Sequence, residues 1–172
     1  MYDAADFAAG AYRMSLSSLV EPDRRFMKLA IKEAERAFDE GEVPIGAIVV
    51  HAGEVVGRGH NMVERLQDPT AHAEIIAITA ACETLKTKVL RGCSLYVTIE
   101  PCPMCAGAMV WAKIDRLVFG ALDEKAGSAS TLYNIPQDKR LNHTLDVISG
   151  VEGNEAAGLM QAFFRERRIS GG

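Results

Sequence analysis

Two short motifs, one around His72 and one around Cys102 and Cys105, constrain the fold of this chain more than any other feature. The cysteines in Pro101-Cys102-Pro103-Met104-Cys105 are three positions apart, so in the first turn of a helix both sulfurs lie on one face. His72, in His72-Ala73-Glu74, falls in the first turn of another predicted helix. Three nitrogen and sulfur ligands suit zinc, and three rather than four leave the open position of a catalytic site. The sequence therefore predicts two helix N-termini that meet around one zinc ion.

Glu74 lies two residues after His72 and is not needed as a metal ligand. Zinc lowers the pKa of a bound water from about 15.7 to about 7, which makes that water a nucleophile at neutral pH. A carboxylate beside it can accept the proton and pass it to a ring nitrogen and a leaving group. We therefore expect His72, Cys102 and Cys105 to bind the metal and Glu74 to act as the catalytic acid and base of a hydrolytic deamination.

A Cys-x-x-Cys pair alone is also typical of structural zinc half-sites and of redox pairs. A structural zinc would need a second pair of ligands, and Cys82 and Cys93, eleven positions apart, do not form one. We expect these two cysteines to be buried thiols. A redox pair would need neither Glu74 nor the helix that begins near His72. The two motifs together favour a catalytic zinc.

Helical and strand patterns alternate along the chain. Apolar residues at three- and four-residue spacing predict a first helix from Asp23 that stops at Gly41, and Pro69 suits the first turn of a second helix. The later patterns predict helices over 71–85, 103–113 and 155–168, strands over 45–50, 55–59, 94–99, 116–119 and 145–148, and a loop-rich segment over 121–142. This alternation predicts an α/β fold, a three-layer α/β/α sandwich with a five-stranded mixed sheet.

The length of 172 residues corresponds to about one domain and suffices to bury a core without disulfides. We expect residues 1–22, rich in Ala and Ser and ending at Glu21-Pro22, to be a flexible N-terminal extension, and residues 23–172 to form a single domain. No apolar run approaches the ~20 residues of a membrane span. The first residues carry acids where a secretory signal needs cations. We therefore expect a cytoplasmic protein without membrane contact.

Further segments carry a resemblance to a known family: residues 42–47 (Glu-Val-Pro-Ile-Gly-Ala), 68–75, 100–108, 118–121, 141–143 and 163–168, with Asp123 and Gly127. With the two motifs they cover most of the chain from Asp23 to Arg168. The sequence resembles the bacterial tRNA-specific adenosine deaminases of the cytidine-deaminase superfamily. The resemblance implies a cytidine-deaminase-like domain and a homodimer with one Zn²⁺ per subunit. It also implies conversion of adenosine to inosine at the wobble position of a tRNA anticodon loop.

The same resemblance implies substrate contacts at Asn61, Ala73 and Asp123. An Asn amide offers both a donor and an acceptor, as a purine edge requires. The alternatives are an Asn that ends a hairpin strand and an Asp that forms a turn. His60 stands where relatives carry an aromatic residue, so the resemblance assigns it no role.

Three arginines, Arg165, Arg167 and Arg168, gather near the end of the last predicted helix, although the net charge of the chain is −4. A local basic patch can hold a phosphate backbone even when the whole chain is acidic. We expect the three arginines to contact the RNA backbone. The alternative is a solvated face whose charges are favourably placed at a helix C-terminus.

Two other functions share these motifs. A free-purine deaminase, guanine deaminase in particular, has a nearly identical zinc motif, but it has no need of the loop after Phe119 or of the segment 163–168. A non-catalytic, zinc-stabilised RNA-binding module would have no use for Glu74. We expect His51 and His143 to be structural or surface residues, and Trp111 to pack in the core or in a dimer interface.

Overall fold

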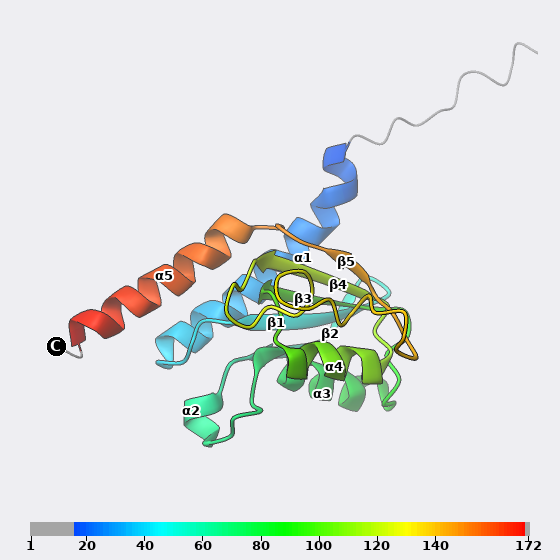
Figure 1. The fold of residues 1–172 in the computed structure, drawn as a ribbon, viewed down its shortest axis with the longest axis horizontal. Coiled ribbons are helices and arrows are strands. Elements are labelled where there is room, and N and C mark those ends of the chain that lie inside the picture. The colour runs from blue at the N-terminus through cyan, green and yellow to red at the C-terminus, as the bar shows by residue number, and fades with distance from the viewer. Residues whose placement is uncertain (1–15, 171–172) are drawn as a thin grey trace, which may run out of the picture.

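The computed structural model describes residues 16–170, which form a five-stranded sheet between two layers of helices (Figure 1). The strand order is β2-β1-β3-β4-β5. Strand β1 (Gly46–His51) pairs antiparallel with β2 (Glu54–His60) and with β3 (Cys93–Ile99). Strand β4 (Arg116–Ala121) pairs parallel with β3 and with β5 (Asp146–Ile148). The predicted three-layer sandwich with a mixed sheet is confirmed.

One face of the sheet is covered by α3 (Ala73–Leu85) and α4 (Pro103–Ala112). Their buried side chains, such as Met109, pack on inward-facing residues of β3 and β4, such as Leu95 and Phe119. The first turn of α3 lies very close to β2, since a Cβ added at Gly59 would be 2.3 Å from the carbonyl oxygen of Ala73. Glycine at this position therefore lets the start of α3 sit directly against the end of β2.

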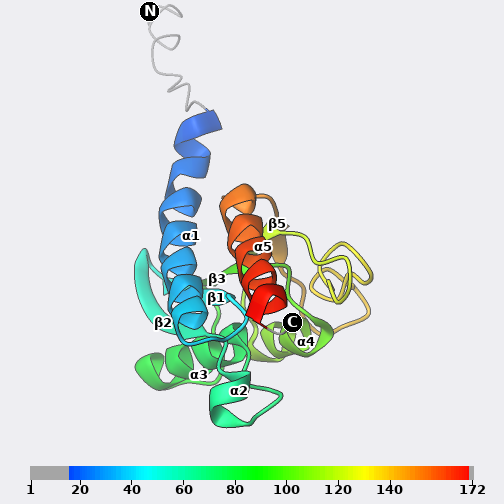
Figure 2. The same ribbon diagram turned by 90° about the vertical axis from the view of Figure 1, so that its left-hand side faces the viewer.

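The opposite face is covered by α1 (Leu16–Asp39) and α5 (Gly153–Ser170), which lie side by side in Figure 2. Met27 and Ile31 of α1 pack with Ile48 and Val118 of the sheet in a second buried cluster. The two helices meet near their C-termini, where the rings of Phe38 and Phe163 stand edge to face with centroids 5.7 Å apart. This contact brings the last turns of α5 to the end of the sheet from which α3 and α4 begin.

The N-terminal boundary differs from the prediction. The first helix begins at Leu16 rather than at Asp23, and Pro22 lies inside it, so residues 16–22 of the expected extension are helical. Proline removes one backbone hydrogen bond of a helix, which is why Glu21-Pro22 suggested a boundary. Residues 1–15 of the expected extension lie outside the described residues, and the division into an extension and one domain stays a prediction.

A short helix, α2 (Val63–Leu66), was not predicted. It has four residues and no buried side chain, so it leaves no apolar periodicity in the sequence. The segment after β4 has little regular structure up to β5, as expected. None of the helices within residues 16–170 is long and apolar enough to cross a membrane.

Candidate active site

The three predicted metal ligands come together at the N-termini of α3 and α4. His72 is the N-cap residue of α3, Cys102 is the N-cap residue of α4, and Cys105 lies in the first turn of α4. The Nδ1 atom of His72 is 3.5 Å from each of the two sulfurs. All three ligand atoms lie within 4.8 Å of one another, which is the spacing of ligands around a single ion.

The chemistry of these donors fits zinc. Hydrogen bonding to Cys105, and further to His72, lowers the pKa of the Cys102 thiol to about 4, and the same shared proton raises the pKa of Cys105. The site thus stabilises a thiolate even before a metal is considered, helped by the positive end of the α4 dipole. One imidazole nitrogen and two sulfurs form a tetrahedral zinc site with one open position.

Glu74 lies in the first turn of α3 and is 3% exposed. Its carboxylate is beside Cys105, and burial raises its pKa to about 7. Oε2 of Glu74 is a buried oxygen for which the described residues provide no hydrogen-bond partner. An orphaned buried carboxylate oxygen is costly in a structural position. Next to three metal ligands, this free oxygen can instead accept a proton from a reacting group and transfer it.

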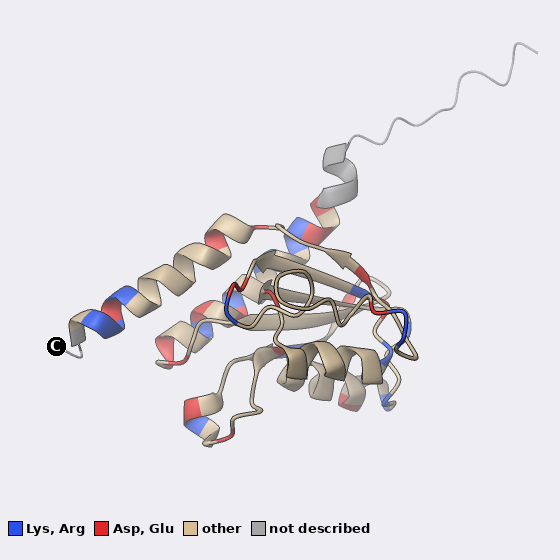
Figure 3. Cartoon of the chain, viewed as in Figure 1, with Lys and Arg blue, Asp and Glu red and all other residues tan. Residues whose placement is uncertain are grey.

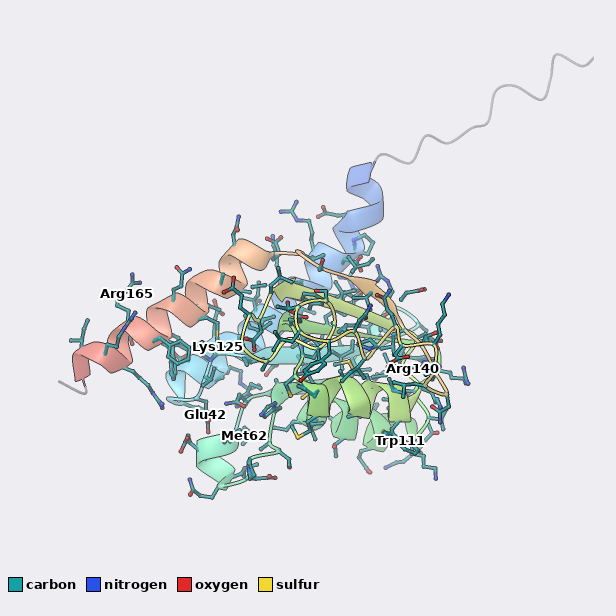
Figure 4. All side chains as sticks on the ribbon, in the orientation of Figure 1. Glu42, Met62, Trp111, Lys125, Arg140 and Arg165 are labelled. Carbon is teal, nitrogen blue, oxygen red and sulfur yellow. The ribbon has the colours of Figure 1, made fainter. Side chains whose placement is uncertain are left out.

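A pocket of about 250 Å³ opens beside these ligands. Figure 4 shows Glu42 and Met62 next to α2. The pocket is lined by Glu42, Val43, Ile45, Asn61, Val63, Glu64, His72 and Arg167. Its walls therefore come from the connection between α1 and β1, from the end of β2, from α2, from the start of α3 and from α5.

The three predicted substrate residues have different surroundings. Asn61 lines the pocket together with His72. Ala73 is fully buried in the first turn of α3, between the ligand His72 and Glu74. Asp123 is not among the pocket-lining residues, and its Oδ1 accepts hydrogen bonds from the backbone N–H groups of Lys125 (2.9 Å) and of Ala126 (3.2 Å). The structure thus shows the turn-forming role of this aspartate.

Basic residues gather near the C-terminal end of α5, with an acidic residue among them (Figure 3), and the three arginines have different surroundings. Arg167 donates from Nη2 to the carbonyl oxygen of Gly41 at 2.8 Å and also lines the pocket beside His72. Arg167 and Arg168 line a second, more open hollow of about 480 Å³ together with Lys125 and Phe164. Arg165 lines a neighbouring hollow on α5 and, in Figure 4, projects from the side of α5 away from Glu42.

Sequence reasoning assigned no role to Lys125, Phe164 or Glu42. Phe164 and Glu42 lie in segments that carry the family resemblance, which is a signal for a role but does not say which one. Lys125 has no such signal, because only the folded loop brings it opposite α5.

Other residues that the sequence singled out are structural. His60 is buried, with Nε2 3.1 Å from a carboxylate oxygen of Glu40 and Nδ1 3.6 Å from Glu33. The Nε2 atom of His143 is 2.6 Å from the carbonyl oxygen of Ile114. Trp111 was expected in the core or in a dimer interface. The core position is wrong, since 78% of this residue is exposed on α4, and the dimer interface stays a prediction.

The remaining singled-out residues lie away from the metal ligands. Cys93 is buried, as expected, whereas Cys82 is only half-buried. His51 ends β1 and is half-buried beside Gly92.

The comparisons with known proteins agree with this geometry. Residues 20–121 match the family model of the cytidine and deoxycytidylate deaminase zinc-binding region. A tRNA-specific adenosine deaminase of Bacillus subtilis (strain 168) is 51% identical over 146 residues, which are 85% of this chain and 91% of the relative. The chain belongs to the tRNA-specific adenosine deaminase family. Zinc is therefore the cofactor of this deaminase, and its three clustered ligands fit that ion.

Two further relatives are similar to this deaminase over most of their length. A tRNA-specific adenosine deaminase of Aquifex aeolicus (strain VF5) is 48% identical over 143 residues, which are 83% of this chain and 94% of the relative. A structure from a study of A-to-I editing by tRNA:A34 deaminases at the wobble position of transfer RNA has a TM-score of 0.76 and 44% identity. The match covers 78% of this chain and 98% of that chain.

Proposed function

We propose that this enzyme converts adenosine to inosine at the wobble position of a tRNA anticodon by zinc-dependent hydrolysis. The observation that carries the chemistry is the buried Glu74, whose Oε2 has no partner among the described residues, beside His72, Cys102 and Cys105. A purely structural zinc site has no use for such a carboxylate. The names of the relatives, which share about half of their residues with this chain, support tRNA as the substrate.

His72, Cys102 and Cys105 would hold the zinc ion, which would supply an activated water for attack on C6 of the adenine ring. Glu74 accepts the proton of the attacking water, delivers it to a ring nitrogen and then helps the amino group leave as ammonia. The burial of Glu74 keeps bulk water from competing for this proton. One water is consumed and one ammonia released for each inosine formed.

The pocket of about 250 Å³ supports a substrate whose base leaves the nucleic-acid stack. An anticodon loop presents such a base at low unstacking cost. In this proposal the amide of Asn61 binds the purine edge and Ala73 supplies part of the wall beside the ligands. Asp123 contributes through the loop whose turn its side chain caps.

The RNA backbone is proposed to bind along the hollow between α5 and the loop after β4. Lys125, Arg167 and Arg168 place positive charge there, and Phe164, 46% exposed, offers a ring for a flanking base. Arg165 extends the positive surface along α5. Affinity for tRNA should therefore weaken as salt concentration rises.

A homodimer and a cytoplasmic location are part of the same proposal. The exposed Trp111, with Met104 at 36% exposure, gives α4 an apolar surface beyond what covers the sheet. A second copy packed on α4 would bury it. Light scattering should then give about twice 18.6 kDa, and a monomer at micromolar concentration would contradict the dimer.

A direct assay compares two substrates side by side. We expect the purified zinc-loaded enzyme to convert a wobble adenosine in an anticodon stem-loop to inosine, detected by sequencing, and to leave free guanine nearly unchanged. Incubation with total tRNA then shows which anticodons are edited. Preference for guanine would overturn the proposed substrate and leave the zinc chemistry in place.

A further inference from the structure

Glu42 is a buried carboxylate that the mechanism above does not use. It follows α1, is 1% exposed, and no Lys or Arg side chain within the described residues is within ion-pair distance of it. Burying an unpaired carboxylate is costly unless several donors bind it. Three N–H groups do so: Asn61 Nδ2 (3.2 Å) and the backbone N of Glu64 (3.2 Å) donate to Oε2, and the backbone N of Arg65 (2.7 Å) donates to Oε1.

We propose that Glu42 is a positioning residue that holds the amide of Asn61 in one of its two orientations and thereby sets the donor and acceptor pattern offered to the purine. The inference rests on the proposed role of Asn61 in substrate binding. An Asn amide can rotate by 180° with little change in shape, which exchanges its oxygen and nitrogen. A carboxylate only accepts hydrogen bonds, so Glu42 selects the orientation in which Nδ2 faces it.

The selected orientation leaves Oδ1 available to the substrate. Asn61 is 6% exposed and lines the pocket with His72. Its backbone N donates to Ile45 at 3.0 Å and its Nδ2 to Glu42, whereas Oδ1 has no hydrogen-bond partner among the described residues. Oδ1 and the second N–H of Nδ2 are thus the groups free to meet a ligand.

Glu42 also holds a second wall of the same pocket. Helix α2 begins without a side-chain cap, since Met62 at the N-cap position makes no such hydrogen bond. The carboxylate of Glu42 takes that place by accepting the N–H groups of Glu64 and Arg65 in the first turn of α2. Through these bonds one side chain sets the amide of Asn61 and the position of the pocket-lining Val63.

The informative variant is Glu42→Gln, which keeps the shape and exchanges one acceptor for a donor. Three N–H groups converge on the two oxygens, so the new amide group meets at least one of them donor to donor in either orientation. We expect kcat/KM for the anticodon stem-loop to fall about 10- to 100-fold, because the variant no longer excludes the flipped amide of Asn61, which leaves a polar group of the bound purine unpaired. Glu35→Gln, an exposed change on α1, is the matched control and should leave kcat/KM within about 2-fold.

A double-mutant cycle separates positioning from a purely structural role. If Glu42 acts through Asn61, Glu42→Gln should lower kcat/KM several-fold less in the Asn61→Ala background than in the wild type, and zinc content should stay near one equivalent. The loss that remains in that background is the effect of Glu42 on α2. Losses that multiply in the double variant would overturn the proposal. If Glu42→Gln does not fold, Glu42→Asp, which keeps the charge but is one methylene shorter, enters the same cycle with the same two outcomes. If the wild type prefers guanine, kcat/KM of the same four proteins is measured on guanine. The tRNA assignment can then fail while the inference about Glu42 is still tested.

Discussion

Replacing Glu100 by Gln tests how the loop after β4 is held against the zinc site. Glu100 is 3% exposed and lies two residues before Cys102. The loop closes around its carboxylate so tightly that a Cβ on Gly127 would be 2.3 Å from Oε2. The carboxylate accepts four backbone N–H groups at 2.8 to 3.1 Å, from Asp123, Ala129, Ser130 and Thr131, and also the hydroxyl of Thr131.

The size of the effect follows from which oxygen the new amide nitrogen replaces. The loss of stability is smallest when the nitrogen takes the place of Oε2, because the hydroxyl of Thr131 can rotate to accept a hydrogen bond from it. The N–H of Asp123 is then left without an acceptor. An orphaned buried N–H costs about 1–3 kcal/mol, and the bonds that lose a charged partner become weaker by about 1 kcal/mol each. Water offsets part of this at the exposed Ser130 and Thr131. We expect the free energy of unfolding to fall by about 2–4 kcal/mol.

Urea unfolding of the zinc-loaded protein, followed by circular dichroism, measures this change. The matched control is Glu124→Gln in the same loop, whose side chain is exposed and whose replacement should cost less than about 0.5 kcal/mol. Zinc content is measured on both variants. A loss below about 1 kcal/mol for Glu100→Gln, with zinc retained, would refute the view that this carboxylate holds the loop.

Three further predictions concern the metal, the catalytic carboxylate and pH. Metal analysis should find about one zinc per chain, and Cys105→Ala should lose most of it because two ligands remain. Glu74→Ala should keep zinc and fold but lose at least about 100-fold in turnover; loss of zinc would instead make Glu74 a ligand. Burial opposes ionisation of Asp23, but hydrogen bonds from Arg116 and Tyr96 hold its pKa below the usual value. The ionised Asp23 therefore stabilises the fold above about pH 4, and this contribution is lost as pH falls through the lowered pKa. Melting temperatures from pH 3 to 7 should show Asp23→Asn well below the wild type at neutral pH and approaching it in acid.

Local patterns were sufficient for most of the regular structure. The strands are short apolar runs that end at glycine or polar residues, and α1 and α5 carry periodic apolar faces. Helices α3 and α4 are apolar on all sides, and small apolar residues after a turn signal mark them. Helix α2 was not predicted because none of its four residues is buried. The start of α1 at Leu16 was not predicted because a proline such as Pro22 is typical of a helix boundary, although this helix continues through it.

The surroundings of individual side chains were harder to predict from local patterns than the helices and strands. The sequence could not decide between a core and a surface position for Trp111, because an apolar residue on a helix does not tell which side faces the sheet. The hydrogen bonds from Asn61 and α2 to Glu42 join residues about twenty positions apart, and no local pattern records them. The turn capped by Asp123 was foreseen only as an alternative to substrate contact.

The sequence by itself determined the metal chemistry, because the three-residue spacing of Cys102 and Cys105 fixes two sulfurs on one helix turn and the types of donor select zinc. It also determined the order of the strands and of every helix except α2, since these patterns are local properties of the chain. Only the tertiary structure decided that His72 comes within 3.5 Å of both sulfurs and that Arg167 reaches the same pocket from α5. It also decided that Oε2 of Glu74 has no hydrogen-bond partner within residues 16–170. These relations depend on how α3, α4 and α5 pack against a sheet made of distant segments, and packing is decided by the whole core at once.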